Sequence, residues 1–178
     1  MNKPQITTAD LEKAIRNIPD FPKPGIQFKD ITPVLADARL FAGAIELLTA
    51  NYKPGSVDAV VGIDARGFIL AAAAALRLQT GFVPVRKKGK LPFQTHEESY
   101  ELEYGSNTVA IHVDAVKPGA RVPLVDDLLA TGGTAAAAVS LLRKIGANIL
   151  EANFLIELGF LDGRKKLRNI PVHSLVNY

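Results

Sequence analysis

Residues 125–134 read "VDDLLATGGT", in which two carboxylates precede two glycines that are flanked by threonines. Glycines allow a backbone to approach a ligand closely, and the amides at the start of a following helix carry partial positive charge. Thr131 and Thr134 add hydroxyl donors. The loop could therefore hold a monophosphate without a lysine. The nucleoside-triphosphate loop is excluded because no lysine follows the second glycine, and the chain has no G-x-G-x-x-G run.

The two carboxylates, Asp126 and Asp127, would repel a phosphate that touched them. We therefore expect them to address another part of the same ligand, and a sugar diol is the natural candidate because ionised carboxylates only accept hydrogen bonds. A ribose 5-phosphate fits this spacing, and negative charge there would stabilise positive charge developing at the anomeric carbon. The alternative is a solvated turn before a helix, since Asp, Thr and Gly are ordinary turn residues.

Two further segments offer anion ligands. Arg66 lies in "DARG" (64–67), just after a predicted strand, where its fork of donors suits a pyrophosphate. The polar segment 86–105 begins with "RKKGK" and is longer than an ordinary connection between strands, which predicts either disorder or a functional lid. A surface ion pair at Arg66 and a solvated basic turn at 86–90 are the alternatives.

The elements around these residues alternate between strands and helices. The predicted strands are residues 57–63, 81–85, 108–113, 121–125 and 148–156, and the predicted helices between them are 68–78 and 135–146. This order predicts an α/β fold with a mostly parallel central sheet flanked by helices, in which ligands bind at the carboxyl ends of the strands. Earlier in the chain we expect helices at 8–18 and 38–52, separated by an irregular proline-rich segment.

Composition limits the function classes. The 178 residues suit one compact domain, and the absence of cysteine excludes a thiolate nucleophile, a disulfide framework and a cysteine-based zinc site. The net charge is only +3, so no duplex-binding face is expected. The start of the chain lacks the apolar region of a signal peptide, and the longest apolar run is too short for a bilayer. We expect a soluble, cytoplasmic protein with no membrane or nucleic-acid partner. His112 and His173 are interpreted as structural, and no metal-ligand spacing is found.

The string at 125–134 resembles the phosphoribosyl-pyrophosphate (PRPP) signature of the type I phosphoribosyltransferases. Further segments strengthen the resemblance, and two of them point to the adenine branch: "IPDFPKPGIQFKDITPVL" (18–35), and "RKKGKLP" with "SYELEYG" (86–105). The resemblance implies the type I phosphoribosyltransferase fold as a single domain, with a small base-binding hood at about 1–35, a PRPP-binding core at about 36–178 and a lid at 86–105. It also implies a homodimer that transfers phosphoribose from PRPP to adenine in purine salvage, giving AMP and pyrophosphate, with Mg²⁺ held mainly by substrate oxygens.

Residue by residue, the resemblance assigns roles to the candidate ligands. The ribose 5-phosphate would bind at Ala130, Thr131, Gly132, Gly133 and Thr134, with Asp126 and Asp127 at the diol, and the pyrophosphate at Arg66, Arg86, Lys87, Lys90 and Tyr104. Glu103 would exchange a proton with N7 of adenine, and Arg66 would share in catalysis. Phe28 and Leu128 would enclose the purine while the backbone at Gln27 and Lys29 reads its edge.

Two residues depart from the family pattern. Lys29 stands where many members have arginine, and Pro123 interrupts a strand that is usually aliphatic, which predicts that the sheet does not need the amide of residue 123. Two other functions stay open at this point. One is a phosphoribosyltransferase for hypoxanthine, guanine or xanthine, and the other is a non-catalytic PRPP sensor.

Overall fold

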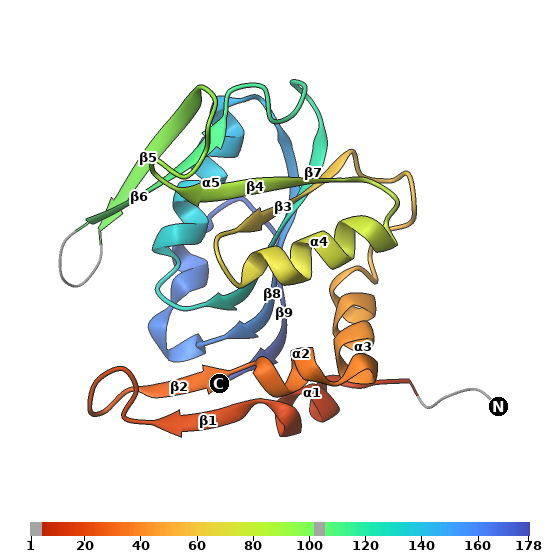
Figure 1. The fold of residues 1–178 in the computed structure, drawn as a ribbon, viewed down its shortest axis with the longest axis vertical. Coiled ribbons are helices and arrows are strands. Elements are labelled where there is room, and N and C mark those ends of the chain that lie inside the picture. Colours follow the sequence, from red (N-terminus) through yellow and green to blue (C-terminus); the bar gives the residue numbers. More distant parts are fainter. Residues whose placement is uncertain (1–4, 102–105) are drawn as a thin grey trace. The chain divides into compact units, whose positions relative to one another are not determined.

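The computed structural model describes residues 5–101 and 106–178. The chain forms two compact units, Met1–Leu47 and Leu48–Tyr178. Figure 1 shows the order of their elements along the chain.

The first unit consists of a short hairpin and three helices. Helix α1 (Thr8–Ala14) starts with a capping box, in which the side chains of Thr7 and Asp10 each accept a hydrogen bond from the other's backbone amide. Strands β1 (Arg16–Pro19) and β2 (Gln27–Asp30) pair antiparallel. Helices α2 (Thr32–Ala36) and α3 (Ala38–Leu48) follow.

The predicted helix at 8–18 is wrong in its second half. The chain leaves the helix at Ile15, which has extended backbone angles, and Ile18 then pairs with Phe28 across the hairpin. Leu11 and Ile15 are buried, as the helical stripe predicted, but pairing with the strand across the hairpin decides the conformation of 16–19. The proline-rich segment forms the hairpin loop, where the Asp20 side chain accepts a hydrogen bond from the Gly25 amide at 2.7 Å.

The described part of the second unit builds one seven-stranded sheet, in the order β5-β6-β4-β3-β7-β8-β9. Its strands are β3 (Ala59–Ile63), β4 (Gly81–Lys87), β5 (Thr95–Glu101), β6 (Ser106–His112), β7 (Arg121–Leu129), β8 (Asn148–Glu157) and β9 (Val172–Asn177). From β4 to β9 in this order, each strand pairs parallel with the next, whereas β6 pairs antiparallel with both β4 and β5. The predicted α/β class with a mostly parallel sheet is confirmed.

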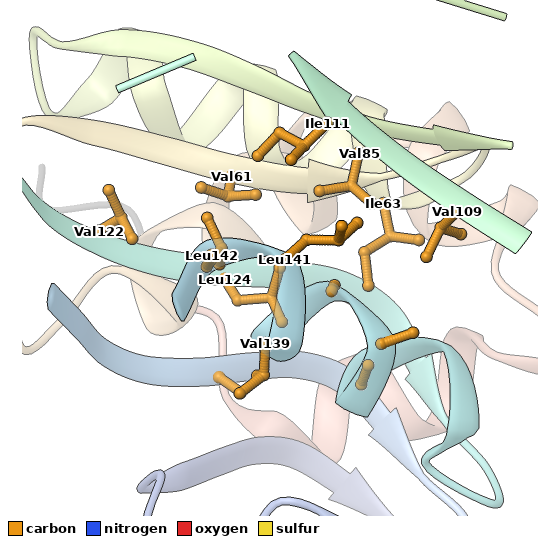
Figure 2. Close-up of a cluster of buried hydrophobic side chains, with 14 of the residues drawn as sticks. Val61, Ile63, Val85, Val109, Ile111, Val122, Leu124, Val139, Leu141 and Leu142 are labelled. Carbon is orange, nitrogen blue, oxygen red and sulfur yellow. The ribbon is translucent and has the colours of Figure 1, made fainter. Parts of the chain in front are cut away.

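Helices cover both faces of this sheet. Figure 2 shows Val61 and Ile63 of β3, with Leu124 of β7, packed against Leu141 and Leu142 of α5 (Gly133–Lys144). All five residues of β3 are buried, as is typical of a central parallel strand.

Helix α4 (Gly67–Arg77) covers the opposite face. The helix lies so close that a Cβ on Gly62 of β3 would come within 2.6 Å of the Ala71 Cβ. Glycine at 62 therefore allows the close packing of α4 on the sheet.

Three strands differ from the prediction. The polar segment 86–105 contains β5, whose register pairs Thr95 with His112 on β6, and the chain also adds β9 at its end. Neither strand has a clean apolar pattern, because both lie at sheet edges and are only partly buried. Strand β7 continues to Leu129, beyond the expected end at Val125, and its ladder with β8 shifts register between Val122 and Pro123. A proline at such an irregularity agrees with the expectation for residue 123.

Candidate functional site

The glycine-rich loop joins β7 to α5 at the carboxyl end of the parallel strands. Gly132 is the N-cap of α5 and adopts a left-handed conformation with φ of 76°, which a glycine accepts without steric cost. Next to the loop lies a concave site of about 170 Å³. It is lined by Asp126, Leu128, Leu129, Ala130, Thr131, Gly132, Gly133, Thr134 and Ala135. The structure thus brings every residue predicted to hold the ribose 5-phosphate into one concavity, together with one of the two aspartates.

The two aspartates are packed against the "DARG" loop. Arg66 places its Nη2 atom 2.8 Å from Oδ2 of Asp127, whose residue is only 6% exposed. The Asp126 side chain accepts a hydrogen bond from the amide of Asp127 at 2.9 Å and lies directly on Gly67, where an added Cβ would overlap its Oδ1 atom. This role of Gly67 was not predicted from the sequence, because no local signal shows which residue it faces.

Burial raises the pKa of both carboxylates. Burial, and then the neighbouring charge of Asp127, raise the pKa of Asp126 well above its ordinary value. Burial also raises the pKa of Asp127, although the Arg66 guanidinium partly offsets this. A ligand that donates hydroxyl groups to the two carboxylates would favour their ionised forms, since hydrogen bonds to a charged carboxylate stabilise it.

Arg86 joins the end of β4 to the "DARG" loop. Its Nε atom donates to Oδ2 of Asp64 at 3.1 Å, and its Nη1 atom donates to the Lys90 carbonyl at 3.0 Å. The guanidinium carbon also lies 6.0 Å from the ring centre of Phe68, within the range of a cation–π contact. Arg86 therefore lies against the loop that carries Arg66.

The other basic residues of 86–90 lie at the surface. Lys87 ends β4 and is exposed, and Lys90 is exposed in the turn that follows, where its amide donates to the Lys87 carbonyl. Lys88, for which no role is predicted, forms an ion pair with Glu97 at 2.7 Å. Exposed ammonium groups at the end of a strand remain able to meet an anion.

Glu103 and Tyr104 lie outside the described residues. The strands on either side of them are described, and Glu101 of β5 pairs with Ser106 of β6. Tyr100 of β5 lies over the start of α5, where a Cβ on Gly133 would come within 3.1 Å of the tyrosine ring. The described end of β5 is therefore beside the glycine-rich loop.

The residues predicted to bind the base are divided between the two units. Gln27, Phe28 and Lys29 lie on β2, where the Gln27 side chain accepts a hydrogen bond from Asn17 at 2.7 Å. Phe28 meets Phe21 edge to face, with ring centres 5.1 Å apart. Leu128 belongs to the second unit and lines the concave site. The pairing of Phe28 with Leu128 around a purine stays a prediction.

Both histidines that were interpreted as structural have partners. The Nε2 atom of His112 lies 3.4 Å from the Phe93 amide, and the Nδ1 atom of His173 lies 3.3 Å from Oδ1 of the buried Asn153. Among residues 5–101 and 106–178, no group of three His, Cys, Asp or Glu side chains is arranged to hold a metal ion. No helix in the described part of the chain is long and apolar enough to cross a membrane.

Known proteins are similar to this chain in sequence and in fold. Residues 28–170 match the model of the phosphoribosyl transferase domain. An adenine phosphoribosyltransferase of Chloroflexus aurantiacus is 53% identical over 173 residues, which are 97% of this chain and 100% of the relative. The crystal structure of adenine phosphoribosyltransferase from Rhodothermus marinus superposes with a TM-score of 0.91 at 52% identity, covering 96% of this chain and 98% of that one.

A third relative was solved with ligands. The adenine phosphoribosyltransferase of Saccharomyces cerevisiae, in complex with D-2,5-dideoxy-2,5-imino-altritol 1,6-bisphosphate and adenine, has a TM-score of 0.90 and 43% identity, covering 94% of this chain and 97% of that one. The family model covers most of the chain, and the relatives match nearly its whole length at high identity. The chain therefore belongs to the phosphoribosyltransferase family, within the branch of the adenine phosphoribosyltransferases.

Proposed function

We propose that this protein transfers the 5-phosphoribosyl group of PRPP to adenine, forming AMP and releasing pyrophosphate. The observation that carries the proposal is the concave site in which the glycine-rich loop and Asp126 lie together, with Asp127 held beside them by Arg66. Relatives at 52–53% identity carry this enzyme's name, and the yeast relative was solved with adenine and a bisphosphate. The protein is then a pentosyltransferase of purine salvage.

The loop and the aspartates bind different parts of the sugar phosphate. The amides at the start of α5 and the hydroxyls of Thr131 and Thr134 bind the 5-phosphate, while Asp126 and Asp127 accept hydrogen bonds from the ribose diol. As the C1–O bond to pyrophosphate breaks and the C1–N9 bond to adenine forms, positive charge develops on the ribose. The two carboxylates stabilise that charge by their fixed position.

The pyrophosphate is the leaving group of this reaction. Arg66 lies in the "DARG" loop, Arg86 is paired with Asp64 of the same loop, and Lys87 and Lys90 lie exposed at and beyond the end of β4. We propose that these four cations, with Tyr104, neutralise the charge left on the pyrophosphate. The segment 86–105 acts as a lid that excludes water from the reacting carbon.

Mg²⁺ would be held mainly by the oxygens of PRPP and by water, which is the usual binding mode of this ion beside phosphates. The site fits an ion held in this way, because Asp126 and Asp127 place hard carboxylate oxygens beside the loop where PRPP would bind. When bound, the ion neutralises part of the charge of the pyrophosphate.

The base would be recognised mainly by backbone groups. We propose that Phe28 and Leu128 contact the two faces of adenine and that the backbone at Gln27 and Lys29 pairs with its edge. A backbone donor facing an acceptor of the base distinguishes a six-amino from a six-oxo purine, because the wrong base leaves a buried group unpaired. Glu103 takes the proton from N7 as the new bond forms.

A second copy of the chain is proposed to pack along α4. The outer side of this helix carries Ile69, Ala72 and Leu76, and Leu76 is 82% exposed. An apolar stripe at helical spacing is typical of an interface, and its helix begins at the "DARG" loop. The cytoplasmic location expected from the sequence remains a prediction.

The test is AMP formation from PRPP and Mg²⁺ with adenine, hypoxanthine and guanine assayed in parallel. Turnover of adenine alone supports the proposal, and Glu103→Gln should then lower kcat by about a hundredfold while leaving PRPP binding unchanged. Glu101→Gln is the matched control, because Glu101 is exposed at the end of the described part of β5. Turnover of an oxo-purine instead would overturn the roles given to Gln27, Phe28 and Lys29, and PRPP binding without turnover would indicate a sensor.

A further inference from the structure

A glycine near the end of the chain lies against the glycine-rich loop. Gly163 begins the short helix η2 (Gly163–Lys166), about thirty residues after the loop in sequence. A Cβ added to Gly163 would overlap the carbonyl oxygen of Ala130 and come within 3.1 Å of the Gly132 amide nitrogen. In the other direction, a Cβ on Gly132 would overlap the Gly163 carbonyl oxygen. The two backbones therefore meet with no room for a side chain on either.

The residue after Gly163 fixes that backbone in place. Arg164 donates from Nε to Glu157 at 2.6 Å, from Nη1 to the Val172 carbonyl at 2.8 Å and from Nη2 to the Ser174 hydroxyl at 2.7 Å. Glu157 is buried, and its other oxygen accepts a hydrogen bond from Ser174. Burial alone would raise the pKa of Glu157, but the hydrogen bonds from Arg164 and Ser174 outweigh it, so the pKa is lowered and the ion pair persists at neutral pH.

The start of the glycine-rich loop is also held by a hydrogen bond to the segment that contains Gly163. The amide of Leu158, one residue after β8, donates to the Leu129 carbonyl at 2.9 Å, and Leu129 is the last residue of β7. Leu167, just after η2, is buried in the core. The segment between Leu158 and Leu167 is thus attached to the sheet on both sides of Gly163.

We propose that Gly163 is a positioning residue for the PRPP loop, held there by the cluster of Arg164, Glu157 and Ser174. The inference rests on the proposed function, because Gly163 is assigned the role of fixing the position of the Gly132 and Gly133 amides relative to the bound 5-phosphate. Gly132 adopts the left-handed conformation at the start of α5, and the Gly163 backbone blocks movement of the loop towards η2. A displacement of the bound phosphate by about 1 Å would misplace the reacting carbon and lower the rate of the reaction.

The first test is Gly163→Ala, compared with Gly81→Ala. Gly163 is not among the glycines with positive φ, so alanine at 163 adds the steric overlap without backbone strain. Gly81 also has an ordinary φ, and no atom lies within 4 Å of its added Cβ. We measure PRPP binding by calorimetry without base, and then KM for PRPP and for adenine separately. Gly163→Ala should weaken PRPP binding by about tenfold to a hundredfold and leave KM for adenine within about twofold, while Gly81→Ala matches the wild type.

Ser174→Ala is the second variant, and it keeps the inference testable if Gly163→Ala does not fold. It removes one partner of Arg164 and one of Glu157 without touching the loop, and should weaken PRPP binding by about twofold to tenfold at unchanged KM for adenine. Equal PRPP affinity in Ser174→Ala and the wild type, or in a folded Gly163→Ala and the wild type, would overturn the proposal. Because binding is measured without base, it is read separately from the adenine turnover on which the proposed function depends.

Discussion

At the residue scale, the site contains a pair of buried carboxylates whose pKa values are raised. Asp126 and Asp127 are adjacent and desolvated, and the Arg66 guanidinium pairs with Asp127. Like charges held together in a low-dielectric site disfavour ionisation, which explains why burial and repulsion both raise the pKa of Asp126. We infer that the hydroxyl groups of the ligand add hydrogen bonds to the ionised pair, so the pair is built for ligand binding at the expense of stability.

A pH dependence of stability follows from that shift. A carboxyl whose pKa is raised in the folded state binds protons more tightly there than in the unfolded chain. The stability gained from this protonation is complete below the unfolded pKa of about 3.8. It is lost as the pH rises through the pKa of the folded state. Asp126→Asn removes the ionisable group, so the variant should lose less stability than the wild type between about pH 5 and about pH 8. Thermal unfolding of the variant and the wild type at both pH values measures this difference in stability.

The same variant separates stability from activity. We expect Asp126→Asn to lower kcat/KM for PRPP by about a hundredfold, because the amide can no longer offer a charge to the ribose. Asp58→Asn is the control, since Asp58 is an aspartate paired with Arg121 at the opposite end of the sheet and its pKa is lowered to about 2. A wild type whose Tm does not depend on pH any more than that of Asp126→Asn would contradict the stability argument.

At the element scale, the β5–β6 hairpin is attached to the helix that follows the glycine-rich loop. Lys144 in the last turn of α5 forms an ion pair with Glu98 of β5 and donates to the Glu97 carbonyl at 3.2 Å. The Lys144 ammonium lowers the pKa of Glu98 by hydrogen bonding and charge. Tyr100 on the same strand lies over Gly133 at the other end of α5. The strand therefore contacts the helix near both ends, and the two should move together.

Removing the cation should loosen the hairpin. In Lys144→Met, the amides of residues 95–101 should exchange with solvent about twofold to fivefold faster, as expected for a partly exposed ion pair worth ~0.5–1 kcal/mol. Lys53→Met is the matched control, because Lys53 is an exposed lysine in the connection between α3 and β3, outside the hairpin and outside α5. Hydrogen exchange read by mass spectrometry gives the rates. Equal rates in the two variants would mean that the hairpin does not depend on Lys144.

At the scale of the whole molecule, the apolar stripe of α4 is a feature that the described fold of one chain leaves exposed. Leu76 and Ile69, two helical turns apart, are both exposed, while the buried side of the same helix packs on the sheet through Leu70, Ala71 and Ala74. A helix with apolar residues on both sides needs a second apolar partner. We propose that a neighbouring copy of this chain supplies it.

The oligomeric state tests this directly. Light scattering should give the wild type a mass of twice 19.1 kDa, and Leu76→Glu should shift the protein to the monomer because it places a charge in the stripe. Phe160→Glu is the control, since Phe160 is 74% exposed on η1 (Gly159–Leu161). A wild-type monomer at micromolar concentration would contradict the dimer. A monomer produced by Phe160→Glu alone would indicate that the interface lies at η1 and not at α4.

The sequence alone determined the features that local chemistry controls. The strand-to-helix loop at 130–134 requires glycines and a following helix, and these are visible in ten consecutive residues. The alternation of predicted strands such as 57–63 and 121–125 with helices requires a parallel sheet, because helical crossovers join parallel strands. The family resemblance, the fold class and the place of the phosphate loop therefore follow from the order of the residues.

Tertiary structure decided what distant residues do to one another. Residues 16–19 and 95–101 became strands because partners elsewhere in the chain pair with them, although their own patterns favoured a helix and a loop. The ion pair of Arg66 with Asp127 and the contact of Gly163 with the glycine-rich loop join residues that are about thirty or more positions apart. Such contacts depend on where the sheet places its strand ends, and no local pattern of residue types encodes that position.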